Sequence, residues 1–130
     1  MIEVVAAFIC DGDHFLICQR PKDKARPLLW ELPGGKVEPG EKKDAALIRE
    51  CYEELGIVLS VHGIFADTIY DYEDATIHLT VLRAIIKEGS LQLLEHNDLR
   101  WIRPEDIPQY NFCPADDAIM KGSFNSLHLQ

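Results

Sequence analysis

Residues 35–57, GKVEPGEKKDAALIRECYEELGI, decide how this chain folds. Their first part holds glycine and proline in a loop, and in their second part apolar residues recur at helical spacing. We therefore predict a helix over residues 42–55, and Gly56 follows it where a helix C-terminal glycine is expected. The segments on both sides of this helix have a different pattern.

The sequence before and after the predicted helix is typical of β-strands. β-branched and apolar residues fill these segments, and glycine, proline and aspartate separate them. The predicted strands are residues 3–10, 14–20, 30–32, 57–70, 76–87 and 99–103, with loops or turns over 21–29, 91–98 and 104–107 and a final helix over 114–124. Pro33, Gly34 and Gly35 are expected to end the third strand. This order predicts an α+β fold, an α/β/α sandwich in which helices cover a mixed central sheet.

Length, charge and cysteine usage narrow the class of protein. We predict one domain over residues 1–130, with no apolar run that reaches the ~18 residues needed to span a membrane and no signal peptide. Four scattered cysteines without a C-x-x-C pair predict reduced thiols and a cytoplasmic location. The net charge of −9 argues against a nucleic-acid polymer as partner. A nucleotide is still a possible ligand, because a divalent cation held by the carboxylates can bind its phosphates.

Three glutamates of the predicted helix share one face. Positions i, i+3 and i+4 are neighbours on a helix, so Glu50, Glu53 and Glu54 project together. Like charges repel, so this group is either a solvated acidic face or is neutralised by a cation. Mg²⁺ prefers oxygen ligands, and the glycines before the helix suit a loop whose carbonyl turns inward. The unit therefore predicts a metal site suited to the hydrolysis of a phosphoanhydride.

The same stretch resembles a known family. The Nudix hydrolases share the pattern G-x5-E-x7-R-E-U-x-E-E-x-G-U, where U is a bulky apolar residue. Every fixed position is filled here, by Gly35, Glu41, Arg49, Glu50, Cys51, Glu53, Glu54, Gly56 and Ile57, with Cys51 small for its place. The preceding W-E-x-P-G-G-K run, residues 30–36, resembles the MutT-like branch. That resemblance implies the Nudix fold and hydrolysis of nucleoside triphosphates to monophosphate and pyrophosphate in nucleotide-pool sanitation, a role tied to DNA replication and repair.

The resemblance also implies roles for single residues. Mg²⁺ is the implied cofactor, with Mn²⁺ able to substitute. Arg49 is expected to orient the glutamates, and Glu41 to pair with it or to support the metal. The implied metal ligands are the Gly35 carbonyl, Glu50, Glu53, Glu54 and Glu95, and the implied catalytic residues are Glu53, Glu54, Glu95 and Arg49. Glu95 stands in the loop before the last strand, where a solvated acid is the alternative interpretation.

Substrate contacts are predicted in two groups. Arg20 and Lys36 are the cations best placed to reach phosphate. Asp116 stands where the MutT pattern P-A-N has an asparagine that recognises an oxidised purine, as P-A-D does in relatives that act on cytidine triphosphates. An ionised Asp116 favours a base with an amino group, such as cytosine or adenine, whereas a protonated Asp116 mimics the amide. The alternative interpretation is that Asp116 caps the final helix. Candidates for the apolar sides of a base slot, or for plain core packing, are Phe8, Ile77, Leu79 and Phe112.

Other functions stay open. A dinucleoside polyphosphate hydrolase is one, because such enzymes favour a tyrosine in the region of Tyr70 and Tyr72. ADP-ribose hydrolases of this fold usually have a proline some fifteen residues beyond the glutamate motif, and this activity is disfavoured because no proline lies between Pro39 and Pro104. A silent nucleotide-binding module is another, although such modules typically lose glutamates that are intact here. The five histidines lack metal-ligand spacing and receive no role. Both a monomer and a homodimer are compatible with the sequence.

Overall fold

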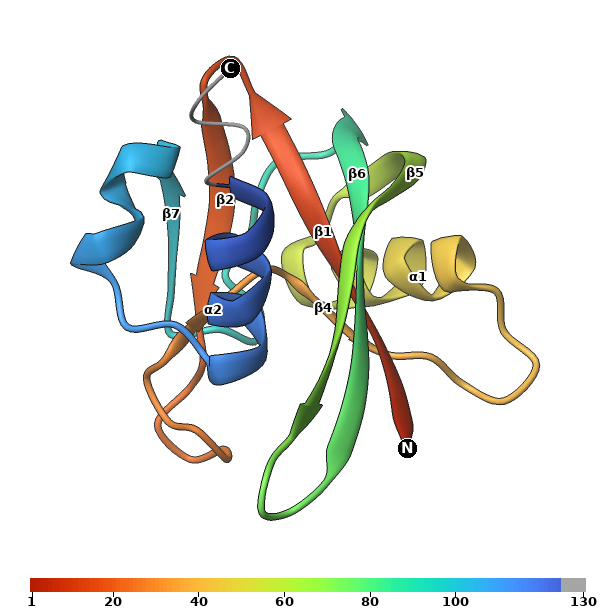
Figure 1. Ribbon diagram of the computed structural model, residues 1–130. Helices are drawn as coiled ribbons and strands as arrows, with labels where there is room; N and C mark the ends of the chain where they lie inside the picture. Colours follow the sequence, from red (N-terminus) through yellow and green to blue (C-terminus); the bar gives the residue numbers. More distant parts are fainter. Residues whose placement is uncertain (125–130) are drawn as a thin grey trace.

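The first strand is the centre of the sheet in the computed structural model, which describes residues 1–124 (Figure 1). Along most of its length β1 (Ile2–Asp11) runs parallel to β6 (Thr76–Glu88). On its other edge, β4 (Gly34–Lys36) pairs with it antiparallel, and its last two residues continue into β2 (His14–Gln19) as a hairpin. β1 therefore joins two groups of strands.

The remaining strands extend the two groups. β5 (Val58–Asp71) pairs antiparallel with β6, with register shifts along it. β2 pairs antiparallel with both β3 (Trp30–Glu31) and β7 (Asp98–Ile102). The result is a mixed sheet of seven strands, which confirms the predicted mixed sheet and adds β4 to the six predicted strands.

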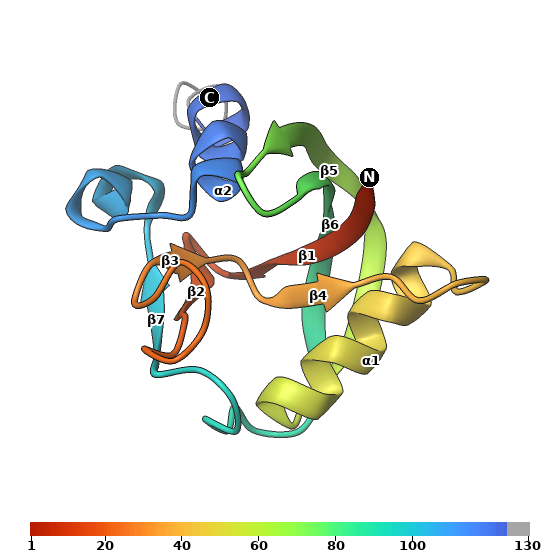
Figure 2. The same ribbon diagram turned by 90° about the horizontal axis from the view of Figure 1, so that it is seen from below.

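Two helices cover opposite faces of this sheet (Figure 2). α1 (Lys43–Leu55) packs on one face and α2 (Pro114–Ile119) on the other. Side chains alternate along β1, so Val5, Ala7 and Ile9 join the core under α1, whereas Ala6 and Phe8 join the core under α2. The predicted α/β/α sandwich is confirmed.

The sequence pattern of α1 explains its orientation. Ala46, Leu47, Cys51 and Leu55 are buried and face the sheet. The helix ends at Gly56, which adopts a left-handed φ of 68° and donates its N–H to the Tyr52 carbonyl at 3.0 Å. No helix among residues 1–124 is long and apolar enough to cross a membrane.

Three segments differ from their predictions. The glycine segment expected to be a loop forms β4 instead: a Cβ on Gly34 would lie 1.9 Å from the Val5 carbonyl oxygen, so the missing side chain allows this close pairing. The turn predicted at residues 104–107 is a 3₁₀ helix, η1 (Pro104–Gln109). The final helix is shorter than predicted, because α2 gives way to a π-helical turn, η2 (Met120–Phe124).

Candidate active site

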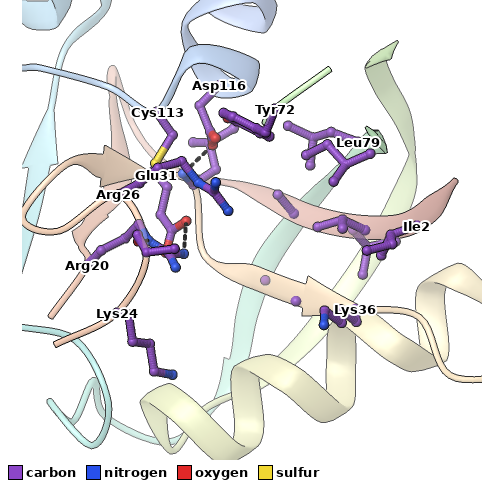
Figure 3. Close-up of a pocket in the computed structure, with 18 of the residues that line it drawn as sticks. Ile2, Arg20, Lys24, Arg26, Glu31, Lys36, Tyr72, Leu79, Cys113 and Asp116 are labelled. Atoms are coloured by element: carbon purple, nitrogen blue, oxygen red, sulfur yellow. Dashed lines mark hydrogen bonds and ion pairs between the residues drawn. The ribbon is translucent and has the colours of Figure 1, made fainter. Parts of the chain in front are cut away.

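A cavity of about 430 Å³ lies between the sheet, the N-terminal end of α2 and the C-terminal half of α1 (Figure 3). β1 forms part of its wall, and the chain from β3 to β4 crosses it. Asp116 and Cys113 mark one end of the cavity, at α2, and Glu54 marks the other end, at α1. We call these the α2 end and the α1 end.

Arg49 fixes two of the glutamates near the α1 end. Its guanidinium donates to both carboxylate oxygens of Glu41, at 2.8 and 3.0 Å, and to Glu50 Oε1 at 2.8 Å. These bonds raise the pKa of Arg49, and together with the Glu38 backbone N–H they lower the pKa of Glu41 to about 2. The family resemblance implies that Arg49 orients the glutamates, and its hydrogen bonds to Glu41 and Glu50 are consistent with that role.

Glu54 is the glutamate of the G-x5-E-x7-R-E-U-x-E-E-x-G-U pattern that lines the cavity. Burial raises the pKa of Glu54 well above its ordinary value, and a hydrogen bond and charge from Glu50 raise it further, with smaller contributions from Glu31 and Glu95. Gly35 approaches the same group, because a Cβ there would lie 2.3 Å from the Glu50 carboxyl carbon. Crowded carboxyl oxygens beside a close backbone segment form an all-oxygen donor set, which fits Mg²⁺.

The other two predicted acids lie differently. Glu53 is 58% exposed, 3.7 Å from Arg49 Nη1, and is not among the residues that line the cavity. Glu95 does line the cavity and forms an ion pair with Lys24, whose hydrogen bond lowers the pKa of Glu95. Glu95 is therefore part of the cavity wall, whereas Glu53 is not.

Four of the six predicted substrate contacts besides Asp116 line the cavity: Arg20, Lys36, Ile77 and Leu79. Phe8 does not, and this placement corrects its prediction. β1 contributes wall residues only as far as Ala6, so Phe8 lies beyond the cavity and packs against Phe15 and Phe65, with ring centroids 5.4 and 4.6 Å apart. Phe112 likewise belongs to the core rather than to the cavity wall.

Asp116 is buried at the α2 end. Its carboxyl oxygen accepts the Leu32 backbone N–H at 2.9 Å, and the residue that begins the helix as its cap is Cys113, so helix capping does not explain Asp116. Burial raises the pKa of Asp116, and the nearby charge of Glu31 raises it further. The protonated form, which can donate a hydrogen bond, is therefore favoured there.

Residues without a predicted role complete the α2 end. Glu31, Cys113 and Asp116 each place one potential ligand atom within 4.8 Å of the others. Burial raises the pKa of the Cys113 thiol, so it stays protonated and suits Mg²⁺ poorly. Arg20 Nη1 pairs with Glu31 Oε1 at 3.1 Å. Glu31 had two signals in the sequence: it is a charge between two apolar residues of a predicted strand, and it is the glutamate of the W-E-x-P-G-G-K run.

Arg26 connects two loops that line the cavity. Its guanidinium lies 4.0 Å from the centre of the Tyr72 ring and 3.2 Å from Asp74 Oδ1, so the loop after β2 contacts the turn between β5 and β6. Tyr72 in turn accepts the Ala115 backbone N–H at 2.9 Å. Arg26 and Leu28 hold positive φ values of 53° and 62°, which are uncommon for side-chain-bearing residues.

Comparisons with known proteins agree with this geometry. The family model described as NUDIX domain matches residues 2–122. The CTP pyrophosphohydrolase of Escherichia coli strain K12 is 41% identical over 121 residues, which cover 93% of this chain and 90% of that one. A putative 8-oxo-dGTP diphosphatase 2 of Mycobacterium tuberculosis strain H37Rv is 34% identical over 115 residues, covering 87% and 81%. The crystal structure of a MutT protein from Methanosarcina mazei Go1 superposes with a TM-score of 0.85 at 25% identity, covering 99% and 96%.

Proposed function

This chain belongs to the Nudix family, and from that premise we propose that it hydrolyses (deoxy)nucleoside triphosphates to the monophosphate and pyrophosphate with Mg²⁺ as cofactor. The proposed substrates are cytidine nucleotides or modified nucleotides, and the proposed role is nucleotide-pool sanitation. The observation that carries the proposal is that one cavity reaches both Glu54 and Asp116. A phosphate chain and a base need two such ends in one pocket.

The α1 end suits the triphosphate. We propose that the Gly35 carbonyl, Glu50, Glu54 and Glu95 hold Mg²⁺, and that Glu53 assists only through Arg49 because it is exposed. When bound, Mg²⁺ supplies the positive charge that neutralises the triphosphate oxygens and the departing pyrophosphate. Mn²⁺ offers the same charge to the same oxygens.

Side chains of the cavity supply the remaining steps. Both Arg20 and Lys36 line the cavity, and we propose that they bind phosphate oxygens. Glu54 accepts the proton of the attacking water in its ionised form, which a bound cation favours. Arg49 keeps Glu50 in place during this transfer.

The α2 end suits the base. A protonated Asp116 donates one hydrogen bond, and Glu31, paired with Arg20, accepts one. Cytosine and adenine each carry an amino donor beside a ring-nitrogen acceptor on one edge, which matches this pair. Ile77 and Leu79 supply apolar wall on which a base can lie. The similar protein from Escherichia coli that is named CTP pyrophosphohydrolase supports the choice of cytosine.

A substrate panel tests the proposal. Pyrophosphate release is measured with and without Mg²⁺ for CTP, dCTP, 5-methyl-dCTP, 2-hydroxy-dATP and 8-oxo-dGTP, and formation of mononucleotides is measured for ADP-ribose and a diadenosine polyphosphate. We expect Mg²⁺-dependent release from the cytidine nucleotides above all others. A higher kcat/KM for 8-oxo-dGTP than for every cytidine nucleotide would refute the proposed base contacts, and no release from any triphosphate would refute the activity.

Compartment and assembly are proposed on separate grounds. All four cysteines are free thiols in the part of the chain that the structure describes, which supports work in the reducing cytoplasm. The site is built from one chain, so it suits a monomer and a homodimer equally.

A further inference from the structure

His96 occupies an unusual place in the cavity wall. It lies in the loop before β7, and its side chain is only 3% exposed. Its Nε2 atom lies 3.4 Å from Glu54 Oε2 and 3.7 Å from Glu31 Oε2. One ring nitrogen therefore lies between two carboxyl groups that arrive from different elements, Glu54 from α1 and Glu31 from β3.

The rest of the ring shows which nitrogen carries the hydrogen. Nδ1 of His96 is buried and has no hydrogen-bond partner among the residues that the structure describes. Carboxyl oxygens accept hydrogen bonds, so the hydrogen belongs on Nε2. A buried polar atom without a partner costs free energy, and an apolar side chain of this size would avoid that cost. Packing alone therefore does not account for a histidine at this position.

We propose that His96 is a positioning residue that links recognition of the base to the geometry of Glu54. Its Nε2 atom faces both carboxyl groups at 3.4 Å from Glu54 and 3.7 Å from Glu31, distances longer than a close hydrogen bond to either one. When the amino group of a base binds Glu31, the hydrogen is left to Glu54, which it then holds in place for the reaction. The inference rests on the proposed function, since it assigns Glu31 to the base and Glu54 to the phosphate chain.

A pair of substitutions separates positioning from packing. In His96→Gln the amide nitrogen reaches the place of Nε2, whereas in His96→Asn it reaches only the place of Nδ1. We expect His96→Asn to lower kcat for CTP about 10- to 100-fold, with KM changed less than about twofold, and His96→Gln to keep most of the activity. Equal losses in both variants, or a change confined to KM, would overturn the proposal.

The link to the base has its own measurement. UTP lacks the amino group that CTP presents, so it cannot release the Nε2–H from Glu31. Wild-type protein should therefore turn over CTP with a higher kcat than UTP, and His96→Asn should remove that difference in kcat. If the ratio of the two kcat values is the same in both proteins, His96 does not carry the link.

A measurement on the metal-free protein keeps the inference distinct from the activity. Long-range ¹⁵N–¹H spectra of the imidazole rings report the tautomer, and the His96 signals are identified by their loss in His96→Asn. We expect the hydrogen on Nε2 of His96, and a hydrogen on Nδ1 alone would overturn the proposal. If wild-type protein releases no pyrophosphate, the proposed function fails on that result, while the tautomer still decides the placement of the hydrogen.

Discussion

Arg49 holds Glu41 through two parallel hydrogen bonds, from Nε to Oε2 at 2.8 Å and from Nη2 to Oε1 at 3.0 Å. The same guanidinium donates to Glu50 at 2.8 Å and to the Lys36 carbonyl at 3.1 Å. One side chain thus ties the turn before α1, the middle of α1 and the end of β4 together. Because Gly35 lies on β4, the spacing between two proposed metal ligands depends on Arg49.

Replacing Arg49 by lysine should weaken both the fold and the site. A lysine ammonium cannot make the planar two-pronged contact with Glu41 while still reaching Glu50. We expect Arg49→Lys to lower the free energy of unfolding by about 1–3 kcal/mol, measured by urea unfolding, and to lower kcat. Arg103→Lys is the matched control, because Arg103 is half exposed and its substitution should change stability by less than about 0.5 kcal/mol. Equal stability of Arg49→Lys and wild type would contradict this role.

A methyl group at Gly35 should disturb the site without unfolding the chain. The Cβ of Gly35→Ala would lie 2.3 Å from the Glu50 carboxyl carbon, so Glu50 has to move. Gly35 has no positive φ, and the effect therefore comes from contact rather than backbone strain. We expect kcat to fall about 100-fold with a small change in melting temperature. Gly122→Ala, which meets open space, should leave both values unchanged, and an active Gly35→Ala enzyme would argue against the placement of Glu50.

Glu54 and Glu53 should differ in their importance although they are neighbours. Glu54→Gln removes a carboxyl group from the cavity wall and should lower kcat about 10²- to 10⁴-fold. The melting temperature should stay equal or rise, because the repulsion between Glu54 and Glu50 is removed. Glu53→Gln removes an exposed carboxylate and should cost far less activity. Pyrophosphate release measured for both variants decides the order, and a larger loss from Glu53→Gln would reverse our assignment.

His78 should make stability depend on pH. Its Nε2 lies 2.8 Å from Asp67 and its Nδ1 lies 2.8 Å from Glu3, and these bonds, Asp67 first, raise its pKa above 6.5. The folded state therefore binds the proton more tightly than the unfolded state, and the stabilisation is complete below pH ~6.5 and is lost as pH rises through the folded-state pKa.

The measurement compares melting temperatures of wild type and His78→Gln from pH 5.5 to 9. The difference should be largest at the acidic end and should shrink toward the basic end. His62→Gln is the control, since His62 contacts Ser60 Oγ at 3.0 Å rather than a carboxylate. A difference that grows with pH would show that the two carboxylates do not stabilise the charged ring.

Local patterns explain how much of this fold could be predicted. The β-branched and apolar composition of residues 3–10 and 76–87, and the spacing of Leu47, Cys51 and Leu55, are properties of neighbouring residues, and the corresponding elements are present. The strand β4 was not predicted because its glycines locally favour a loop. It forms because it pairs with β1, a contact between segments that are distant in the sequence.

The site was predictable where a motif is continuous and not where contacts cross the fold. Glu54 lines the cavity, as expected for a glutamate of the continuous sequence pattern in residues 35–57. Asp116 accepts a hydrogen bond from the Leu32 backbone N–H, 84 positions away in the sequence, and no local pattern predicts that these two residues are in contact. His96 was given no role because its neighbours in sequence supply no ligand pattern, while its neighbours in space are two glutamates.

The short chain from Glu31 to Gly35 sets a length scale for the ligand. Glu31 faces the α2 end and Gly35 the α1 end, and four residues of extended backbone span at most about 13–14 Å. Pro33 forms a bend between β3 and β4, so the two ends lie closer together than this upper limit. Under the proposed function, a nucleoside triphosphate long enough to contact both ends is held twice, whereas the monophosphate product contacts only one. We therefore expect the product to bind more weakly than the substrate, which favours its departure.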